Sequence, residues 1–154
     1  MIQITLAALH LLALPLGLAA VVARAAALRA GPDTTALHRA LRADALWGVA
    51  ALLWLGTGLW RWLGGVEMPA ELYTRNPLLH VKLGLFAGVF ALEIWPMITL
   101  LRWRRALTAG ASAVDLLEHR VAQRIARISA VQAVIVVGIV FVAAALARGY
   151  GLSA

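Results

Sequence analysis

Four ionisable side chains lie within apolar stretches of the chain, where each of them could do chemistry. His10 lies in a run from about residue 2 to 23 that contains no Asp, Glu, Lys or Arg. His80 and Lys82 open another apolar run, and Glu93 lies deeper within it. An ionisable group is costly in an apolar environment, so each of these residues is expected to be either paired or functional.

His10 is the strongest ligand candidate, because a neutral imidazole can bind a metal ion or the iron of a haem. It shares a stripe of seven-residue spacing with Gln3, Gly17 and Arg24, and such a polar stripe should face other helices. Its alternative role is a neutral histidine that is hydrogen-bonded across a helix bundle.

His80 and Lys82 are expected near the same end of the bundle as His10. Two histidines on two helices at one end of a bundle could together hold a haem. On a helical wheel, however, His80 lies about 160° from Lys82. Arg61 and Arg75 flank the neighbouring loop, where they could receive an anionic group or act as interfacial anchors.

Several roles are open to Glu93 on the evidence of the sequence. It could relay protons or contact a substrate. It could instead form a buried ion pair with Arg24 or Arg127, or be a protonated carboxyl bonded to Gln132 or Ser129.

The elements that carry these residues are predicted to be membrane-spanning helices. The chain has 154 residues, of which 63% are hydrophobic and 14% charged, and its mean hydropathy is +0.87. Soluble domains have roughly 45–50% apolar residues, so this composition strongly disfavours a soluble one-domain enzyme. A span needs about 20 mostly apolar residues. Four stretches qualify, which predicts a single all-α domain with a four-helix bundle, with spans at about 2–23, 45–63, 78–101 and 128–147.

Basic residues predict the orientation of the bundle. The first connection holds four of the 14 basic residues and the third holds six. Since cytoplasmic loops are rich in Lys and Arg, both termini are predicted outside, in the bacterial inner membrane. Residues 113–128 repeat apolar side chains at helical spacing, which predicts an amphipathic cytoplasmic helix leading into the fourth span. Asp44, just before the second span, is expected at a helix N-terminus near the headgroups.

Several classes of chemistry are excluded or disfavoured. The chain has no Cys, so disulfides, iron–sulfur clusters and thiolate zinc sites are impossible. No Ser-His-Asp arrangement or pair of general-acid carboxylates is visible, and no residue is assigned a catalytic role. The basic stripe of Arg120, Arg124 and Arg127 is short and lacks interleaved aromatic residues, so no nucleic-acid partner is expected.

Three runs of sequence carry a resemblance to a known family. They are residues 42–53, residues 57–61 and residues 73–82, and they are supported by the Arg-rich exit of the third span. Together they resemble an uncharacterised bacterial family of four-span membrane proteins over essentially the whole chain. The layout is more distantly similar to HemJ-type protoporphyrinogen oxidases and CopD-like proteins, through Leu9-His10 and His80-Val81-Lys82.

The distant resemblance implies a haem b site. It implies that His10 is the haem ligand and that Lys82 contacts a propionate or a substrate. HemJ-type proteins carry an Asn-Glu-x-Pro-like run at the fourth span, where this chain has Ser129-Ala130-Val131-Gln132. The resemblance therefore extends to haem binding rather than to the oxidase reaction.

Three functions follow as hypotheses. The first is a haem b-binding membrane protein with a redox or porphyrin-related role. The second is a non-catalytic accessory or assembly subunit, because a small chain with short loops and small-residue seams suits helix docking in a homo-oligomer or a larger complex. The third is a small transporter or proton pathway that uses Glu93.

Overall fold

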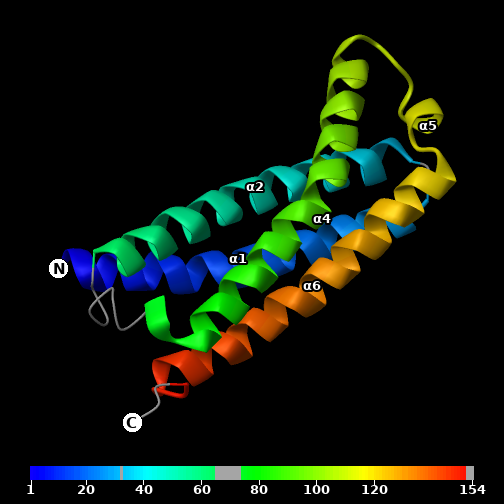
Figure 1. The fold of residues 1–154 in the computed structure, drawn as a ribbon. Coiled ribbons are helices and arrows are strands. Elements are labelled where there is room, and N and C mark those ends of the chain that lie inside the picture. Colours follow the sequence, from blue (N-terminus) through cyan, green and yellow to red (C-terminus); the bar gives the residue numbers. More distant parts are fainter. Residues whose placement is uncertain (32, 65–73, 152–154) are drawn as a thin grey trace.

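The computed structural model describes residues 1–31, 33–64 and 74–151 (Figure 1). Every regular secondary-structure element in these residues is a helix. Four of its helices are long and apolar enough to cross a membrane. The prediction of an all-α membrane bundle is therefore confirmed. The helices are α1 (Ile2–Arg29), α2 (Thr34–Leu63), α4 (Pro77–Thr108), the short α5 (Ala113–Leu116) and α6 (His119–Ala147).

Local sequence signals set the helix ends. Gly31 has a φ of 121°, which an L side chain rarely adopts, and it separates α1 from α2. Asn76 caps α4, since its side chain accepts a 2.9 Å hydrogen bond from the backbone N–H of Leu78. Pro77 occupies the first position of that helix, where its missing N–H costs nothing.

The helices extend beyond the predicted spans. α2 begins at Thr34 rather than near residue 45, and α6 begins at His119 rather than near residue 128. These extensions are amphipathic, so a hydropathy criterion misses them. Their apolar sides meet in a core in which Leu37 and Ile125 are fully buried.

The amphipathic helix predicted over residues 113–128 is interrupted. α5 ends at Leu116, and Leu117 leaves the helical conformation with φ −78° and ψ 62° while its side chain is buried in the core. The helix resumes at His119 as the start of α6. The Leu117 side chain is therefore buried at a point where the helix is broken.

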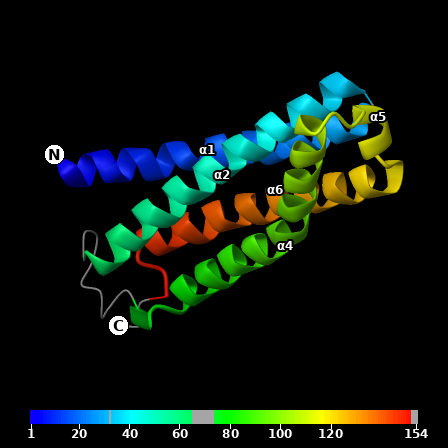
Figure 2. The same ribbon diagram turned by 90° about the horizontal axis from the view of Figure 1, so that it is seen from above.

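The four long helices pack unequally. α1 packs along both α2 and α6, and α4 packs along α6, whereas α2 and α4 touch only slightly. The helices spread apart toward the end of the bundle that holds the N-terminus and the end of α6 (Figures 1 and 2). At the opposite end, the last turns of α4 beyond Pro96 point away from the bundle (Figure 1).

Candidate functional site

Two polar sites are built between these helices, and the first is centred on Arg24 of α1. The Arg24 guanidinium forms a two-pronged ion pair with Glu93 of α4, with Nη–Oε distances of 2.6 and 2.7 Å. Its Nη1 also donates to Asp44 of α2 at 2.8 Å. Its Nε donates to Ser129 at 2.9 Å and its Nη2 to Gln132 at 2.8 Å, both on α6. This Arg24 cluster joins all four long helices.

The polar atoms of the Arg24 cluster are hydrogen-bonded to one another or to nearby backbone. Gln132 accepts from Arg24, and its amide nitrogen donates to Glu93 at 2.8 Å and to the carbonyl of Val89 at 3.2 Å. Across the described part of the chain, no buried side-chain nitrogen or oxygen lacks a partner. Breaking such a pair would leave a charge unpaired in an apolar interior, so the cluster fixes how the helices meet.

Among the alternatives for Glu93, the structure shows the pair with Arg24 together with a hydrogen bond from Gln132. Two expectations around it are wrong. Arg127 is exposed and lies outside the cluster, because α6 turns that side chain away from the core. Asp44 does not lie at a helix N-terminus, because α2 starts ten residues earlier, at Thr34, and turns Asp44 toward Arg24.

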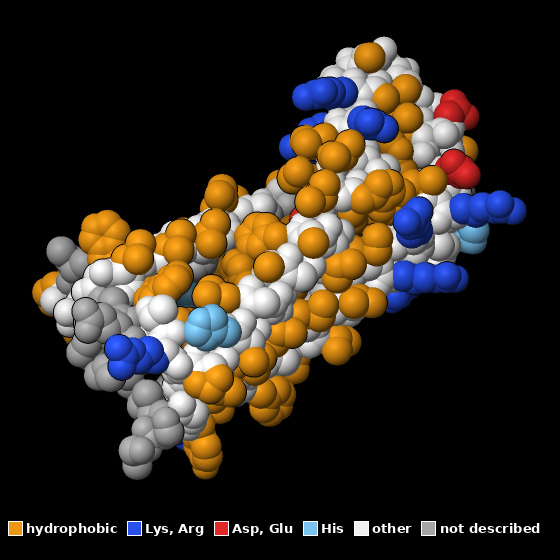
Figure 3. All heavy atoms as spheres, in the orientation of Figure 1, with side chains coloured by type: hydrophobic (Ala, Val, Ile, Leu, Met, Phe, Trp, Pro, Cys, Tyr) orange, Lys and Arg blue, Asp and Glu red, His pale blue; other side chains and the backbone are white. Residues whose placement is uncertain are grey.

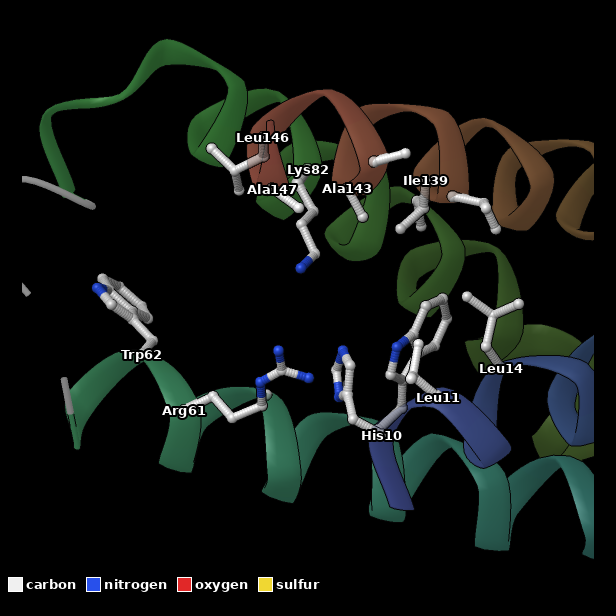
Figure 4. Close-up of a pocket in the computed structure, with 14 residues that line it drawn as sticks. His10, Leu11, Leu14, Arg61, Trp62, Lys82, Ile139, Ala143, Leu146 and Ala147 are labelled. Atoms are coloured by element: carbon white, nitrogen blue, oxygen red, sulfur yellow. The ribbon is translucent and has the colours of Figure 1, made fainter. Parts of the chain in front are cut away.

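The second site is a cleft of about 500 Å³ at the end where the helices spread apart (Figure 4). All four long helices contribute to this His10 cleft. Among the lining residues within the described ranges, the polar ones are cationic or neutral and the others are apolar. The lining residues are His10, Leu11, Leu14, Trp54, Gly58, Arg61, Trp62, Lys82, Ile139, Val140, Ala143, Ala144, Leu146 and Ala147.

A hydrogen bond fixes the ring of His10. Its Nδ1 lies 2.9 Å from the hydroxyl oxygen of Thr57 on α2. That hydroxyl donates to the carbonyl of Leu53 at 2.5 Å, so it accepts from the Nδ1–H of His10. The Nε2 of His10 then carries the free lone pair. Figure 4 shows the imidazole directed into the cleft.

The cleft is complementary to an amphipathic anion. Arg61 of α2 and Lys82 of α4 direct their charged ends into it (Figure 4), and no carboxylate is among the lining residues that the structure describes. Trp54 packs beside His10, with ring centroids 6.2 Å apart. Cations at one side and aliphatic and aromatic walls elsewhere would bind a ligand with an acidic edge and an apolar body.

The structure does not bring His80 and Arg75 into this site. Both side chains are exposed, and neither lines the cleft. The Nδ1 of His80 instead lies 3.2 Å from the carbonyl oxygen of Asn76, one turn back in its own chain. Since Lys82 faces the cleft, a residue about 160° away on the same helix must face outward. The two-histidine arrangement is therefore wrong.

Thr57 and Trp54 were not predicted as site residues, and Trp54 was interpreted as a packing residue. Trp54, Thr57, Gly58 and Arg61 follow the i, i+3, i+4, i+7 pattern of one helical face, so the signal was present. No group of three or more His, Cys, Asp or Glu able to hold a metal ion occurs among the residues that the structure describes.

The fold and the two sites define a multi-pass α-helical membrane protein with a closed ion-pair core and an open cationic cleft. The chain belongs to a family of predicted membrane proteins, DUF2214, whose model matches residues 2–151. No curated protein and no solved structure matches it significantly. The family membership confirms the predicted resemblance to an uncharacterised membrane family, whereas the likeness to HemJ-type and CopD-like proteins is not shown and stays a prediction.

Proposed function

We propose that this protein binds haem b in the His10 cleft and has a redox or porphyrin-related role in the bacterial inner membrane. The observation that carries the proposal is the orientation of His10. Its Nδ1 is held by Thr57, and its Nε2 faces a cleft that also contains Arg61 and Lys82.

The residues of the cleft suit a haem. A ligating histidine usually donates its second ring N–H to a fixed acceptor, and Thr57 is that acceptor for His10. Arg61 and Lys82 would hold the two propionates by charge-assisted hydrogen bonds. Trp54, Leu14 and the aliphatic residues of α6 would cover the apolar porphyrin and exclude water.

When bound, a haem supplies one-electron chemistry, and the protein supplies its position and surroundings. Because His80 faces outward, the described lining offers one imidazole rather than two.

The accessory-subunit function remains the second candidate, and one face of α4 supports it. His80, Gly84 and Ala91 lie on that face, and all three are exposed. Small residues allow another membrane helix to approach closely. This function predicts a colourless protein that co-purifies with a larger membrane complex or with a second copy of itself.

The proton-pathway function has less support. Both carboxylate oxygens of Glu93 are bonded to Arg24, and one of them also accepts from Gln132. A relay group would have to leave these partners to move a proton. Proteoliposome flux that depends on Glu93 would support this function, and flux unchanged in Glu93→Gln would exclude it.

The orientation proposed for the bundle places α5 and the basic ends of the helices in the cytoplasm. Figure 3 shows Lys and Arg gathered toward that end and hydrophobic side chains over most of the remaining face. The positive-inside rule then places the termini and the His10 cleft on the outer side. A cysteine accessibility assay with Gln3→Cys and Ala111→Cys, both at exposed positions, would test this orientation.

An absorption spectrum tests the proposed function. The full chain is purified in mild detergent from haem-replete cells, and a reduced-minus-oxidised spectrum is recorded. We expect a Soret band with b-type α and β bands in the wild type and in His80→Ala, and their loss in His10→Ala. A colourless wild-type preparation that also fails to take up added haemin would contradict the proposal.

A further inference from the structure

A groove lies at the opposite end of the bundle from the His10 cleft, between α2 and α4. Its volume is about 280 Å³, and its lining is basic and apolar apart from Thr108. His38, Arg42 and Ala45 come from α2, and Arg104 and Leu107 come from α4. We propose that this groove binds one anionic phospholipid, with its phosphate held between Arg42 and Arg104.

The two arginines are suited to a phosphate. Arg104 is oriented toward α2, because its Nη2 donates to the backbone carbonyl of Leu41 at 3.1 Å. Its other guanidinium nitrogens have no hydrogen-bond partner among the described residues, and a guanidinium matches phosphate oxygens geometrically. Arg42 lines both this groove and an adjoining hollow that holds Arg39 and His38. Asp44, a neighbour of Arg42 in sequence, is already paired with Arg24.

The surface beside the groove is suited to acyl chains. On α2, Val49 and Leu52 continue the helical face of Arg42 and Ala45, and both are more than half exposed. On α4, Leu101 and Met97 continue the face of Arg104 and are exposed as well. α2 and α4 are also the neighbouring helices that touch only slightly.

These observations favour a lipid over a free anion. A basic cluster alone would attract any phosphate, whereas this one is continuous with an exposed apolar surface on both helices. Basic pockets between membrane helices are a common mode of anionic-lipid recognition. The site is independent of the His10 cleft, so it does not rest on haem binding.

Native mass spectrometry of the full chain in detergent tests the proposal, with phosphatidylglycerol, phosphatidylcholine and inorganic phosphate as separate probes. We expect one phosphatidylglycerol to be retained in preference to phosphatidylcholine. The double variant Arg42→Gln/Arg104→Gln should weaken this adduct about tenfold more than its control does, as expected for loss of hydrogen bonds to a charged group. Inorganic phosphate should not displace the lipid.

The matched control is Arg102→Gln/Arg105→Gln. Both of these arginines are exposed on α4 near Arg104, and neither lines the groove. The control removes the same charge from the same end, so it measures general electrostatic attraction. Equal weakening by the two double variants, or displacement of the lipid by inorganic phosphate, would overturn the proposal. If the double variant does not fold, Arg42→Gln against Arg102→Gln gives the same comparison, since Arg42 is exposed.

Discussion

The Nδ1 of His10 on α1 lies 2.9 Å from the hydroxyl oxygen of Thr57 on α2. This contact ties the proposed iron ligand to a second helix, and the hydroxyl is itself held by the carbonyl of Leu53. The ring of His10 is therefore held in one direction before any ligand binds. Gly58 allows this approach, since a Cβ there would meet the Cε1 of His10 at 3.2 Å.

Replacement of Thr57 by Val should weaken haem binding without removing His10. Loss of a hydrogen-bonding partner behind a ligating histidine typically costs 10–100-fold in affinity, and we expect a loss of about that size. Titration of the apoprotein with haemin, followed at the Soret band, measures it. Thr57→Ser keeps the hydroxyl and should bind as the wild type does. Equal affinity in Thr57→Val would show that the hydroxyl does not position the ring.

Loss of the charge of Lys82 should affect the acidic edge of the ligand and not its apolar body. We expect Lys82→Met to weaken haem binding about tenfold, the cost of one charge-assisted hydrogen bond, and to leave binding of haem dimethyl ester unchanged. Arg75→Gln is the matched control, because Arg75 is exposed and does not line the cleft. A parallel loss for haem and its ester would contradict the role given to Lys82.

Replacement of Arg24 by Met should strongly destabilise the fold. It would leave Glu93 and Asp44 without their shared cation, and breaking a buried pair costs about 3–5 kcal/mol. Chemical unfolding in detergent, followed by tryptophan fluorescence, measures the change. Arg29→Gln removes an exposed arginine of the same helix and should change the free energy of unfolding by less than about 0.5 kcal/mol. A change of less than about 0.5 kcal/mol in the free energy of unfolding of Arg24→Met would mean that the cluster does not hold the helices together.

Two glycines should respond in opposite directions to replacement by Ala. A Cβ at Gly17 would lie 3.0 Å from the ring of Trp47, so Gly17→Ala should cost about 1–3 kcal/mol through overpacking. A Cβ at Gly48 would meet nothing within 4 Å. Gly48→Ala should therefore stabilise the helix by up to about 1 kcal/mol. Thermal unfolding of both variants checks this, and equal shifts would contradict the packing of α1 on α2.

The helices could be predicted from the sequence, because four long apolar runs permit little else. The pair of Arg24 with Glu93 was foreseen as one of several alternatives, since an acid within a span needs a partner. The position of Asp44 could not be predicted from hydropathy. The polar turns from Thr34 to Asp44 are helical because their buried side packs in the core, and a hydropathy window averages that side with the exposed one.

The candidate site was predicted only in part. His10, Arg61 and Lys82 line one cleft, as the sequence analysis grouped them, whereas His80 faces away. The helical wheel had placed His80 opposite Lys82 but could not say which of the two faces the bundle. Thr57 was missed because a hydroxyl in a helix usually bonds its own backbone, and only packing shows that it also meets His10.

Rescue of a cavity variant by imidazole tests the ligand role of His10 most directly. His10→Gly removes the side chain and leaves room for a free imidazole beside Thr57. We predict that this variant lacks the b-type spectrum, that added imidazole restores it, and that His80→Gly keeps it throughout. A b-type spectrum that persists in His10→Gly without imidazole would contradict the account, because the iron would then be held by another residue.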